Sequence, residues 1–162
     1  MRITARTGFL AGLLLAIPVA LWLWQLWTPA RQVQLHSENL LAAIEAHDWE
    51  GIAEFVDEAY ADQWEQDRAL MLSRLEQVLR FARNLRISVE APAVTATESD
   101  GEWSARITVD ADANEVSELI KARVNALDRP FELRWQRKSE KPWDWKLVRV
   151  SNTALQLPEG NF

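Results

Sequence analysis

The first strong pattern in the chain is an uncharged, almost wholly apolar run from Gly8 to Trp27, which reads GFLAGLLLAIPVALWLWQLW. Twenty residues at a helical rise of about 1.5 Å span about 30 Å, the thickness of the hydrocarbon core of a bilayer. Three tryptophans stand near its C-terminal end, where indole rings favour the interface between water and lipid. Arg2 and Arg6 precede the run, so the positive-inside rule keeps the N-terminus in the cytoplasm. The pattern predicts a transmembrane helix over residues 8–27, preceded by a cytoplasmic N-terminus at residues 1–7.

This segment has two other interpretations. A cleaved signal peptide usually has a shorter apolar region, of about 7–15 residues, followed by a small-x-small site. Thr28-Pro29-Ala30 matches such a site poorly. A buried core helix is less consistent with hydrophobicity on all sides over this length. We therefore expect an uncleaved anchor that contacts the lipid bilayer through residues 8–27, in a single-pass protein of the cytoplasmic (inner) membrane whose domain lies on the periplasmic or other extracytoplasmic side.

Beyond a juxtamembrane linker at residues 28–34, apolar residues recur at the helical period in three segments. The first predicted helix runs from about residue 33 to residue 46. Asp48 is a good N-cap for a second helix, and Asp67 begins a third that extends to about Arg83. The inward faces would hold Leu40, Leu41 and Ile44 in the first helix, Ile52, Phe55, Val56, Ala59 and Tyr60 in the second, and Met71, Leu72, Leu75, Val78, Leu79 and Ala82 in the third.

Near Leu85 the apolar period changes from about 3.6 residues to about 2, which is typical of half-buried strands. Pro92 interrupts the first of these strands or marks it as an edge strand. Asp112 and Glu115 form a start signal for a short fourth helix that extends to about Leu127. Four strands are predicted, at about 85–92, 103–109, 131–135 and 145–150, with a turn at Ser99-Asp100-Gly101 between the first two.

Helices followed by strands are the signature of the α+β class. We expect an N-terminal transmembrane helix followed by helices packed on a curved antiparallel four-stranded sheet. This α+β domain would cover residues 35–152, and residues 153–162 would form a C-terminal tail without a clear period.

Three features of this domain resemble a known superfamily. They are the junction His47-Asp48-Trp49 between two helices, the amphipathic helix that leads into a strand, and the closing strands Phe131-Glu-Leu-Arg-Trp135 and Trp145-Lys-Leu-Val-Arg-Val150. Together they resemble the nuclear transport factor 2-like (NTF2-like) superfamily, a cone-shaped, cystatin-like α+β fold. The helix expected at 116–127 departs from the simplest pattern of that superfamily, which has a tight hairpin there.

Composition and charge exclude several classes of function. The chain has no cysteine, so a disulfide framework, a zinc–thiolate site and a thiol nucleophile are impossible. The first 31 residues hold only Arg2, Arg6 and Arg31, so the remaining 15 basic and 24 acidic residues give a net charge of −9. That sign disfavours nucleic acid as a partner and predicts that the folded part stands off anionic lipid headgroups.

Metal chemistry finds little support. His36 and His47 are the only histidines, and their separation along one helix, about 16 Å, prevents them from sharing a metal ion. His47 at a helix end is typical of a capping or surface residue. Glu54, Glu58 and Asp62 follow one another at a spacing that is usual for a solvated helix face. No metal site is predicted.

The resemblance implies candidate chemistry inside the cone, because some members of the superfamily are isomerases, dehydratases or cyclases that use an Asp, His or Tyr there. Tyr60 lies on the apolar stripe of the second helix, with Asp57 at its edge. The tryptophans of the strand half could line an apolar pocket, although core packing is their commoner role, and Trp143 beside Pro142 is expected to be exposed. No inward acid or histidine is identified on a strand, so no catalytic residue and no cofactor is predicted. The ligand-pocket candidates are Asp57, Tyr60, Trp103, Trp135 and Trp145.

These observations favour a membrane-tethered binding or scaffold module without catalytic machinery. Its partner would be a second copy or another protein that binds through the sheet, and tethering would raise the effective concentration of that partner. The layout is similar to the inner-membrane scaffolds of type IV secretion, which join one membrane span to a domain of this class. The alternative is a small-molecule enzyme of the isomerase or dehydratase kind, or a ligand carrier. That alternative requires an open cone, because Trp and Leu side chains that filled it would leave no room for a ligand.

Overall fold

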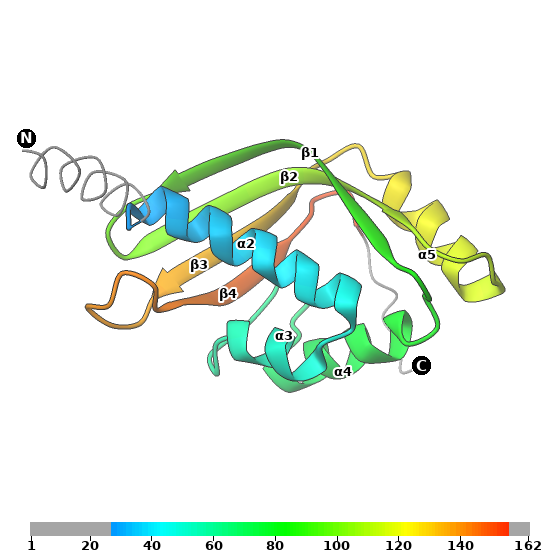
Figure 1. The fold of residues 1–162 in the computed structure, drawn as a ribbon, viewed down its shortest axis with the longest axis horizontal. Coiled ribbons are helices and arrows are strands. Elements are labelled where there is room, and N and C mark those ends of the chain that lie inside the picture. Colours follow the sequence, from blue (N-terminus) through cyan, green and yellow to red (C-terminus); the bar gives the residue numbers. More distant parts are fainter. Residues whose placement is uncertain (1–26, 156–162) are drawn as a thin grey trace, which may run out of the picture.

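The computed structural model describes residues 27–155 and has an α+β architecture built on one four-stranded sheet (Figure 1). The predicted anchor and cytoplasmic N-terminus, apart from Trp27, and residues 156–162 of the predicted tail lie outside the described residues. Among the helices of residues 27–155, none combines the length and apolar character needed to cross a bilayer. The elements are α2 (Pro29–Ala46), α3 (Trp49–Phe55), α4 (Arg68–Leu79), β1 (Arg86–Ala96), β2 (Asp100–Asp110), α5 (Glu115–Asn125), β3 (Phe131–Arg137) and β4 (Trp145–Ser151).

The predicted four-stranded antiparallel sheet is confirmed. The strands follow one another in the order β1-β2-β3-β4, and every neighbouring pair is antiparallel. The pairing register of β1 shifts between Glu90 and Ala93, around Pro92, because proline cannot donate a ladder hydrogen bond. β1 is an edge strand, as the proline indicated. Figure 1 shows α2 lying across one face of the sheet, with α3 and α4 beside it and α5 beyond the far end.

The start of α2 corrects the predicted linker. Residues 28–34 were expected to connect the anchor to the domain, but the helix begins at Pro29 and Val33 is fully buried. Thr28 takes an extended conformation (ψ 141°) and is the N-cap residue, because a following proline disfavours helical backbone angles. Pro29 itself suits the first helical position. A single non-helical residue therefore separates Trp27 from the folded domain.

The second helix is shorter than predicted. It begins at the Asp48 cap, whose side chain accepts a hydrogen bond from Gly51 N at 3.0 Å, but it ends at Phe55 instead of reaching Tyr60. From Val56 onward the backbone runs beside β4, where Asp57 N donates to Leu147 O at 2.9 Å and Ala61 N to Val148 O at 3.2 Å. These distant hydrogen bonds replace those that a longer helix would make.

The third and fourth helices also differ in detail from the prediction. Asp67 caps α4, but the helix ends at Leu79, and Val78 is 47% exposed instead of facing inward. The cap of α5 is Asn114, whose side chain accepts from Ser117 N at 2.9 Å, in place of the predicted signal at Asp112 and Glu115. Leu119, an apolar residue of this helix, is 60% exposed.

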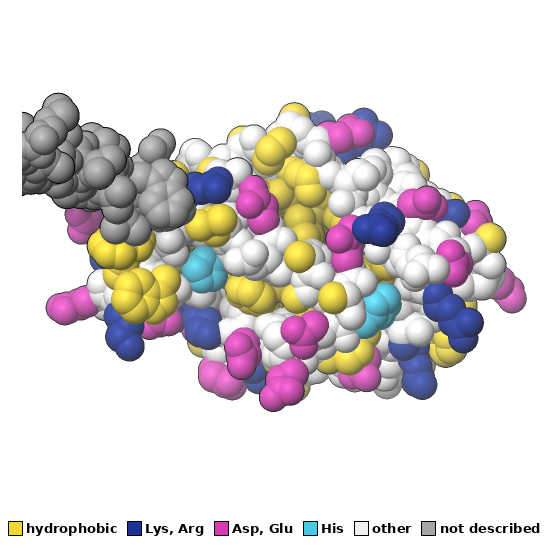
Figure 2. All heavy atoms as spheres, viewed as in Figure 1, with side chains coloured by type: hydrophobic (Ala, Val, Ile, Leu, Met, Phe, Trp, Pro, Cys, Tyr) yellow, Lys and Arg dark blue, Asp and Glu magenta, His cyan; other side chains and the backbone are white. Residues whose placement is uncertain are grey.

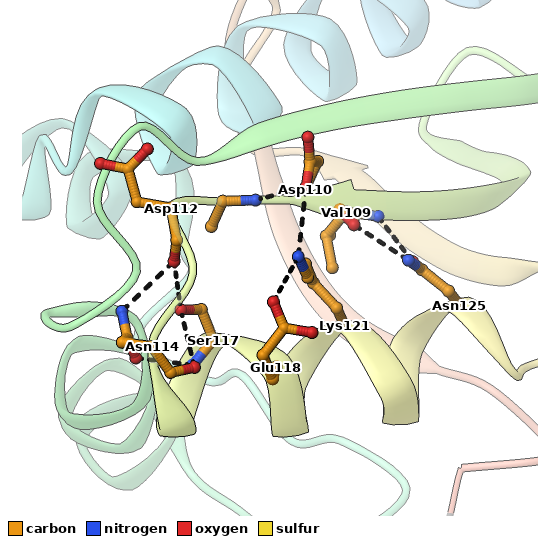
Figure 3. Close-up of polar contacts among 9 residues, drawn as sticks. Val109, Asp110, Asp112, Asn114, Ser117, Glu118, Lys121 and Asn125 are labelled. Atoms are coloured by element: carbon orange, nitrogen blue, oxygen red, sulfur yellow. Dashed lines mark hydrogen bonds and ion pairs between the residues drawn. The ribbon is translucent and has the colours of Figure 1, made fainter.

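The helix α5 protects the end of β2 on the side where β3 no longer pairs with it, while β1 pairs with the other side as far as Asp110. β3 pairs with β2 only as far as Ala105, so the last residues of β2 extend past it. The Asn125 side chain binds both backbone groups of Val109, accepting from its N–H at 2.7 Å and donating to its carbonyl at 3.0 Å (Figure 3). Ser117 Oγ donates to Asp112 O at 2.6 Å and holds the other end of α5. One amide thus satisfies the donor and the acceptor that a neighbouring strand would pair.

The core lies between α2 and the sheet. Its large side chains come from α2 and from the strands. The second turn of α2, at Val33, packs against Gly101 at the start of β2. The buried side chains of the main cluster are Val33, Leu40, Ile52, Val56, Tyr60, Trp103, Ala105, Leu133, Trp135, Trp145 and Leu147.

The packing leaves no space for a side chain at Gly101. A Cβ atom at residue 101 would lie 2.3 Å from Cγ2 of Val33, a stiff and fully buried side chain. We predict that Gly101→Ala lowers the free energy of unfolding by about 1–3 kcal/mol, the usual cost of overpacking a filled core. Adding Val33→Ala should cost less than the sum of the two single changes, measured by thermal or denaturant unfolding. Ser104→Ala, on the outer face of the same strand, is the control, and additive effects would contradict the contact.

Candidate functional site

The interior of the cone holds four of the five predicted pocket residues, packed as core. Tyr60, Trp103, Trp135 and Trp145 are each exposed by 3% or less. Trp135 Nε1 donates to Ser37 Oγ at 2.9 Å, and Trp145 Nε1 donates to Pro142 O at 2.8 Å. Because the bulk of each indole is enclosed and these two N–H groups have partners inside the protein, the side chains fill the interior.

Tyr60 is buried beside a carboxylate. Its hydroxyl lies 3.5 Å from Asp62 Oδ2, and Asp62 is itself 8% exposed. Burial and then the negative charge of Asp62 raise the pKa of Tyr60 above its ordinary value of 10.0. Asp62 was expected on a solvated helix face with Glu54 and Glu58. It instead lies in the loop after α3, where its Oδ1 accepts from Trp64 N at 2.8 Å and Gln66 N at 2.9 Å.

Asp57 points to a different partner. It follows α3 and makes an ion pair of 2.9 Å with Lys138 on the β3–β4 hairpin, while its Oδ1 accepts from Ala59 N at 2.9 Å. Partial burial alone would raise the pKa of Asp57, but the hydrogen bonds from Lys138 and Ala59 and the nearby lysine charges outweigh it and lower the pKa below 3.8. The side chains of Asp57 and Tyr60 therefore do not share a cavity.

A cleft opens beside the β3–β4 hairpin, outside the filled interior. It has a volume of about 330 Å³ and is open to solvent. Helix α2 contributes His36 and helix α3 contributes Phe55, while the hairpin contributes the exposed Trp143. We name it the hairpin cleft, and its lining residues are His36, Glu54, Phe55, Lys141, Trp143, Asp144, Trp145 and Lys146.

His36 has a defined orientation in the hairpin cleft. Its Nδ1 lies 2.8 Å from the carbonyl oxygen of Gln32, so Nδ1 carries the proton and donates. The edges of the ring meet Phe55 and Trp135, with centroids 6.1 and 5.7 Å apart. Both histidines of the chain are visible on the face in Figure 2. His47, in contrast, caps α2 in a left-handed conformation (φ 55°), and its Nε2 lies 3.1 Å from Leu79 O, as expected for a capping residue.

Sequence reasoning identified only part of the hairpin cleft. It predicted Trp145 as a pocket residue, and Trp145, although only 2% exposed, is among the residues that line the cleft. It also predicted Trp143 to be exposed, and that residue is 56% exposed. It did not associate His36 with Trp143, because α2 and the hairpin are far apart in the chain and no local pattern links them. A second depression of about 280 Å³ lies between α2 and β1 and is more apolar, with Leu41, Val89 and Trp103 in its lining. Within residues 27–155, no three His, Asp or Glu side chains gather closely enough to hold a metal ion.

The comparisons with known proteins bear on the fold. No protein-family model matches the sequence, and no curated protein matches it. Among solved structures, an NTF2-like protein of unknown function from Pseudomonas putida KT2440 has a TM-score of 0.58 at 10% identity, over 75% of this chain and 82% of that one. A proposed dehydratase of the NTF2-like family from Streptomyces avermitilis has a TM-score of 0.57 at 13% identity, over 76% and 93% of the two chains.

A third similar structure belongs to a longer protein. Bd1075 of Bdellovibrio bacteriovorus has a TM-score of 0.57 at 11% identity over 75% of this chain, which spans only 38% of the length of Bd1075. Together with the four-stranded antiparallel sheet, these likenesses show the fold. The domain has the NTF2-like, cystatin-like α+β fold that the sequence features indicated.

The single tyrosine of the chain offers a direct test of the filled interior. The pKa of Tyr60 is raised in the folded state, so its contribution to stability is fully present below about pH 10 and is lost as the pH rises above that value. We predict that phenolate absorbance stays absent in the folded protein until alkaline unfolding and then appears together with the loss of tryptophan fluorescence anisotropy. A phenolate that titrates near pH 10 in the folded protein would show that Tyr60 faces solvent.

The ion pair of Asp57 predicts a pH dependence of stability opposite in direction to that of Tyr60. Because the folded-state pKa of Asp57 is lowered, the associated stability is present above pH 3.8 and is lost as the pH falls through the lower folded value. Lys138→Met should raise the pKa of the Asp57 carboxyl, measured by carboxyl-carbon NMR titration. Lys141→Met, which changes an exposed lysine of the same hairpin, is the matched control, and an equal effect of the two variants would contradict the pairing.

Proposed function

We propose that this protein is a membrane-anchored, extracytoplasmic binding or scaffold module that works without catalysis. The observation that carries the proposal is the filled cone, in which Trp103, Trp135 and Trp145 occupy the space that a substrate would need. Ligand sites are usually concave and largely preformed, so a packed interior argues against chemistry there. The anchor rests on the sequence pattern of residues 8–27.

The outer face of the sheet is the surface that we propose for the partner. Side chains alternate along each strand, and the residues between the buried ones point away from the helices. Across the strands, Glu102 pairs in register with Arg134, and Arg134 pairs with Arg149. All three are at least partly exposed, so the described helices leave this row uncovered.

The charges of this face suit a polar, self-complementary partner. Nearer the far end of the sheet, Glu90 pairs in register with Arg106 and Arg86 with Asp110. Three register pairs on this face thus bring an acid beside a base, while Arg134 and Arg149 place two bases side by side. Complementary charges favour specificity and fixed register over raw affinity, which fits weak association that membrane tethering strengthens.

The hairpin cleft supports a second candidate, a small-molecule carrier or enzyme. Its volume, about 330 Å³, lies at the lower end of the range of about 300–1,000 Å³ for ligand sites. The ring of His36, which lines the cleft, is held in one orientation by its hydrogen bond to Gln32 O. The similar solved structures include a proposed dehydratase and a proposed aromatic ring hydroxylase. Addition of small carboxylates or aromatics should then shift the ring signals of His36 in NMR spectra and leave those of His47 unchanged.

The proposed partner surface can be tested by charge reversal. Crosslinking of the full chain in membranes should give a discrete dimer or hetero-complex, and Arg134→Glu should reduce it several-fold by placing like charges beside Glu102. The double change Glu102→Arg with Arg134→Glu should restore a dimer. Arg123→Glu, on the exposed side of α5, is the matched control. A strictly monomeric chain without a co-purifying protein would contradict the proposal.

A further inference from the structure

One end of the domain receives the chain from the predicted anchor. α2 begins at Pro29, and only Thr28 stands between it and Trp27, the last residue of the apolar run. A single extended residue spans about 3.5 Å, so the first turn of α2 cannot lie far from the end of a membrane span at Trp27. The acidic domain was expected to stand off the bilayer, but no linker exists that would hold this end away from it.

Both β-hairpins reach the same end. A Cβ atom at Gly101, at the base of the β1–β2 turn, would touch Val33 in the second turn of α2. The β3–β4 hairpin lies near α2, because Trp143 of the hairpin and His36 of the helix line the same cleft. Figure 1 shows both turns beside the start of α2, with α5 at the opposite end of the molecule. We name the start of α2 and the two turns, residues 27–31, 97–100 and 137–144, the proximal end.

The proximal end carries exposed indoles. Trp27 is 51% exposed and Trp143 is 56% exposed, and Figure 2 shows hydrophobic side chains gathered where the described chain begins. An indole combines a large apolar ring with one polar N–H, and this combination favours the level of the lipid headgroups.

The charge of the proximal end also differs from that of the rest of the domain. Beyond residue 31 the chain carries a net charge of −9, which repels anionic headgroups. At the proximal end the two signs are equal in number, so this repulsion is absent. The basic members are Arg31, Arg137, Lys138 and Lys141, and the acidic members are Glu98, Asp100, Glu140 and Asp144.

We propose that the proximal end rests on the bilayer that holds the anchor, with the indole of Trp143 placed among the lipid headgroups. The inference rests on the proposed anchor and goes beyond it, because a tether alone does not fix the orientation of a domain. Two contacts, at Trp27 and at Trp143, restrict rotation about the single residue Thr28. The strands then run away from the membrane, and the outer face of the sheet is presented sideways to partners in the same bilayer.

The absence of cysteine makes the orientation directly measurable. A nitroxide label is placed on Glu140→Cys, in the same hairpin as Trp143 and three residues before it, in the full chain reconstituted into vesicles of phosphatidylethanolamine and phosphatidylglycerol. The matched control label is on Leu119→Cys, which is 60% exposed on α5 at the opposite end. We expect a water-soluble nickel complex to collide several-fold less often with the label at 140 than with the label at 119, measured by power-saturation EPR. Adding Trp143→Ala should abolish most of that difference.

A third label separates this inference from the anchor on which it rests. A label on Leu14→Cys should be accessible to oxygen and protected from the nickel complex if residues 8–27 span the bilayer. If that label is in lipid while labels 140 and 119 are equally accessible to nickel, the anchor stands and the membrane contact of the proximal end is wrong. A label at 14 that is accessible to the nickel complex would overturn the anchor itself. Dipolar broadening between labels at 140 would identify a second copy of the chain as the covering surface, which would also overturn the membrane contact.

Discussion

The packing of one stripe of α2 against the sheet determines the rest of the structure. Ser37 lies at the centre of this stripe, fully buried, where its hydroxyl donates to Val33 O at 2.9 Å and accepts from the indole of Trp135 at 2.9 Å. A buried indole N–H without a partner would cost about 1–3 kcal/mol, so a small hydroxyl in the helix allows the largest side chain of β3 to occupy the interior. The same stripe brings Val33 against Gly101 and His36 against Trp135. The filled cone, the position of the hairpins and the hairpin cleft therefore have one common cause.

The two ends of the sheet are completed in different ways. At the proximal end, two hairpins join β1 to β2 and β3 to β4. At the opposite end β1 and β2 continue beyond β3, and side chains satisfy the exposed backbone there: Asn125 binds Val109, and Glu45 Oε1 accepts from the outward N–H of Ile87 at 2.5 Å. Such side-chain contacts block the addition of a further strand at these positions. Association through the outer face, which carries both acids and bases, remains open, whereas edge-to-edge pairing at Ile87 and Val109 is blocked.

The parts of the fold that were predicted from the sequence are those that a local period encodes. Alternation after Leu85 located the four strands, and Asp48 and Asp67 located two helix starts, because a cap acts within one turn. The end of α3 was not predicted, because Val56 and Asp57 exchange helical geometry for contacts with Leu147, which lies far along the chain. The tryptophans were correctly placed in the strands, but whether they lined a cavity or filled it depended on distant partners, such as Ser37 of α2 for Trp135. The hairpin cleft escaped prediction for the same reason, since His36 and Trp143 meet only after the sheet has formed.

The likeness to proteins of proposed enzymatic function must be weighed against this interior. A shared fold does not carry a shared activity, because activity depends on the side chains that line a site. In this domain the side chain most suited to acid–base chemistry within the cone, Tyr60, is buried with its pKa raised, and Asp57 is turned outward to Lys138. An enzyme needs a group whose protonation changes near working pH and a space beside it for the substrate, and neither requirement is met around Tyr60. The features available for binding lie on the surface of the domain. They are the charged outer face of the sheet, the hairpin cleft beside the exposed Trp143, and the proximal end. Because each of these lies on the outside of the packed core, their mutual arrangement depends on the packing of α2, and a defined arrangement is what the proposed scaffold role requires.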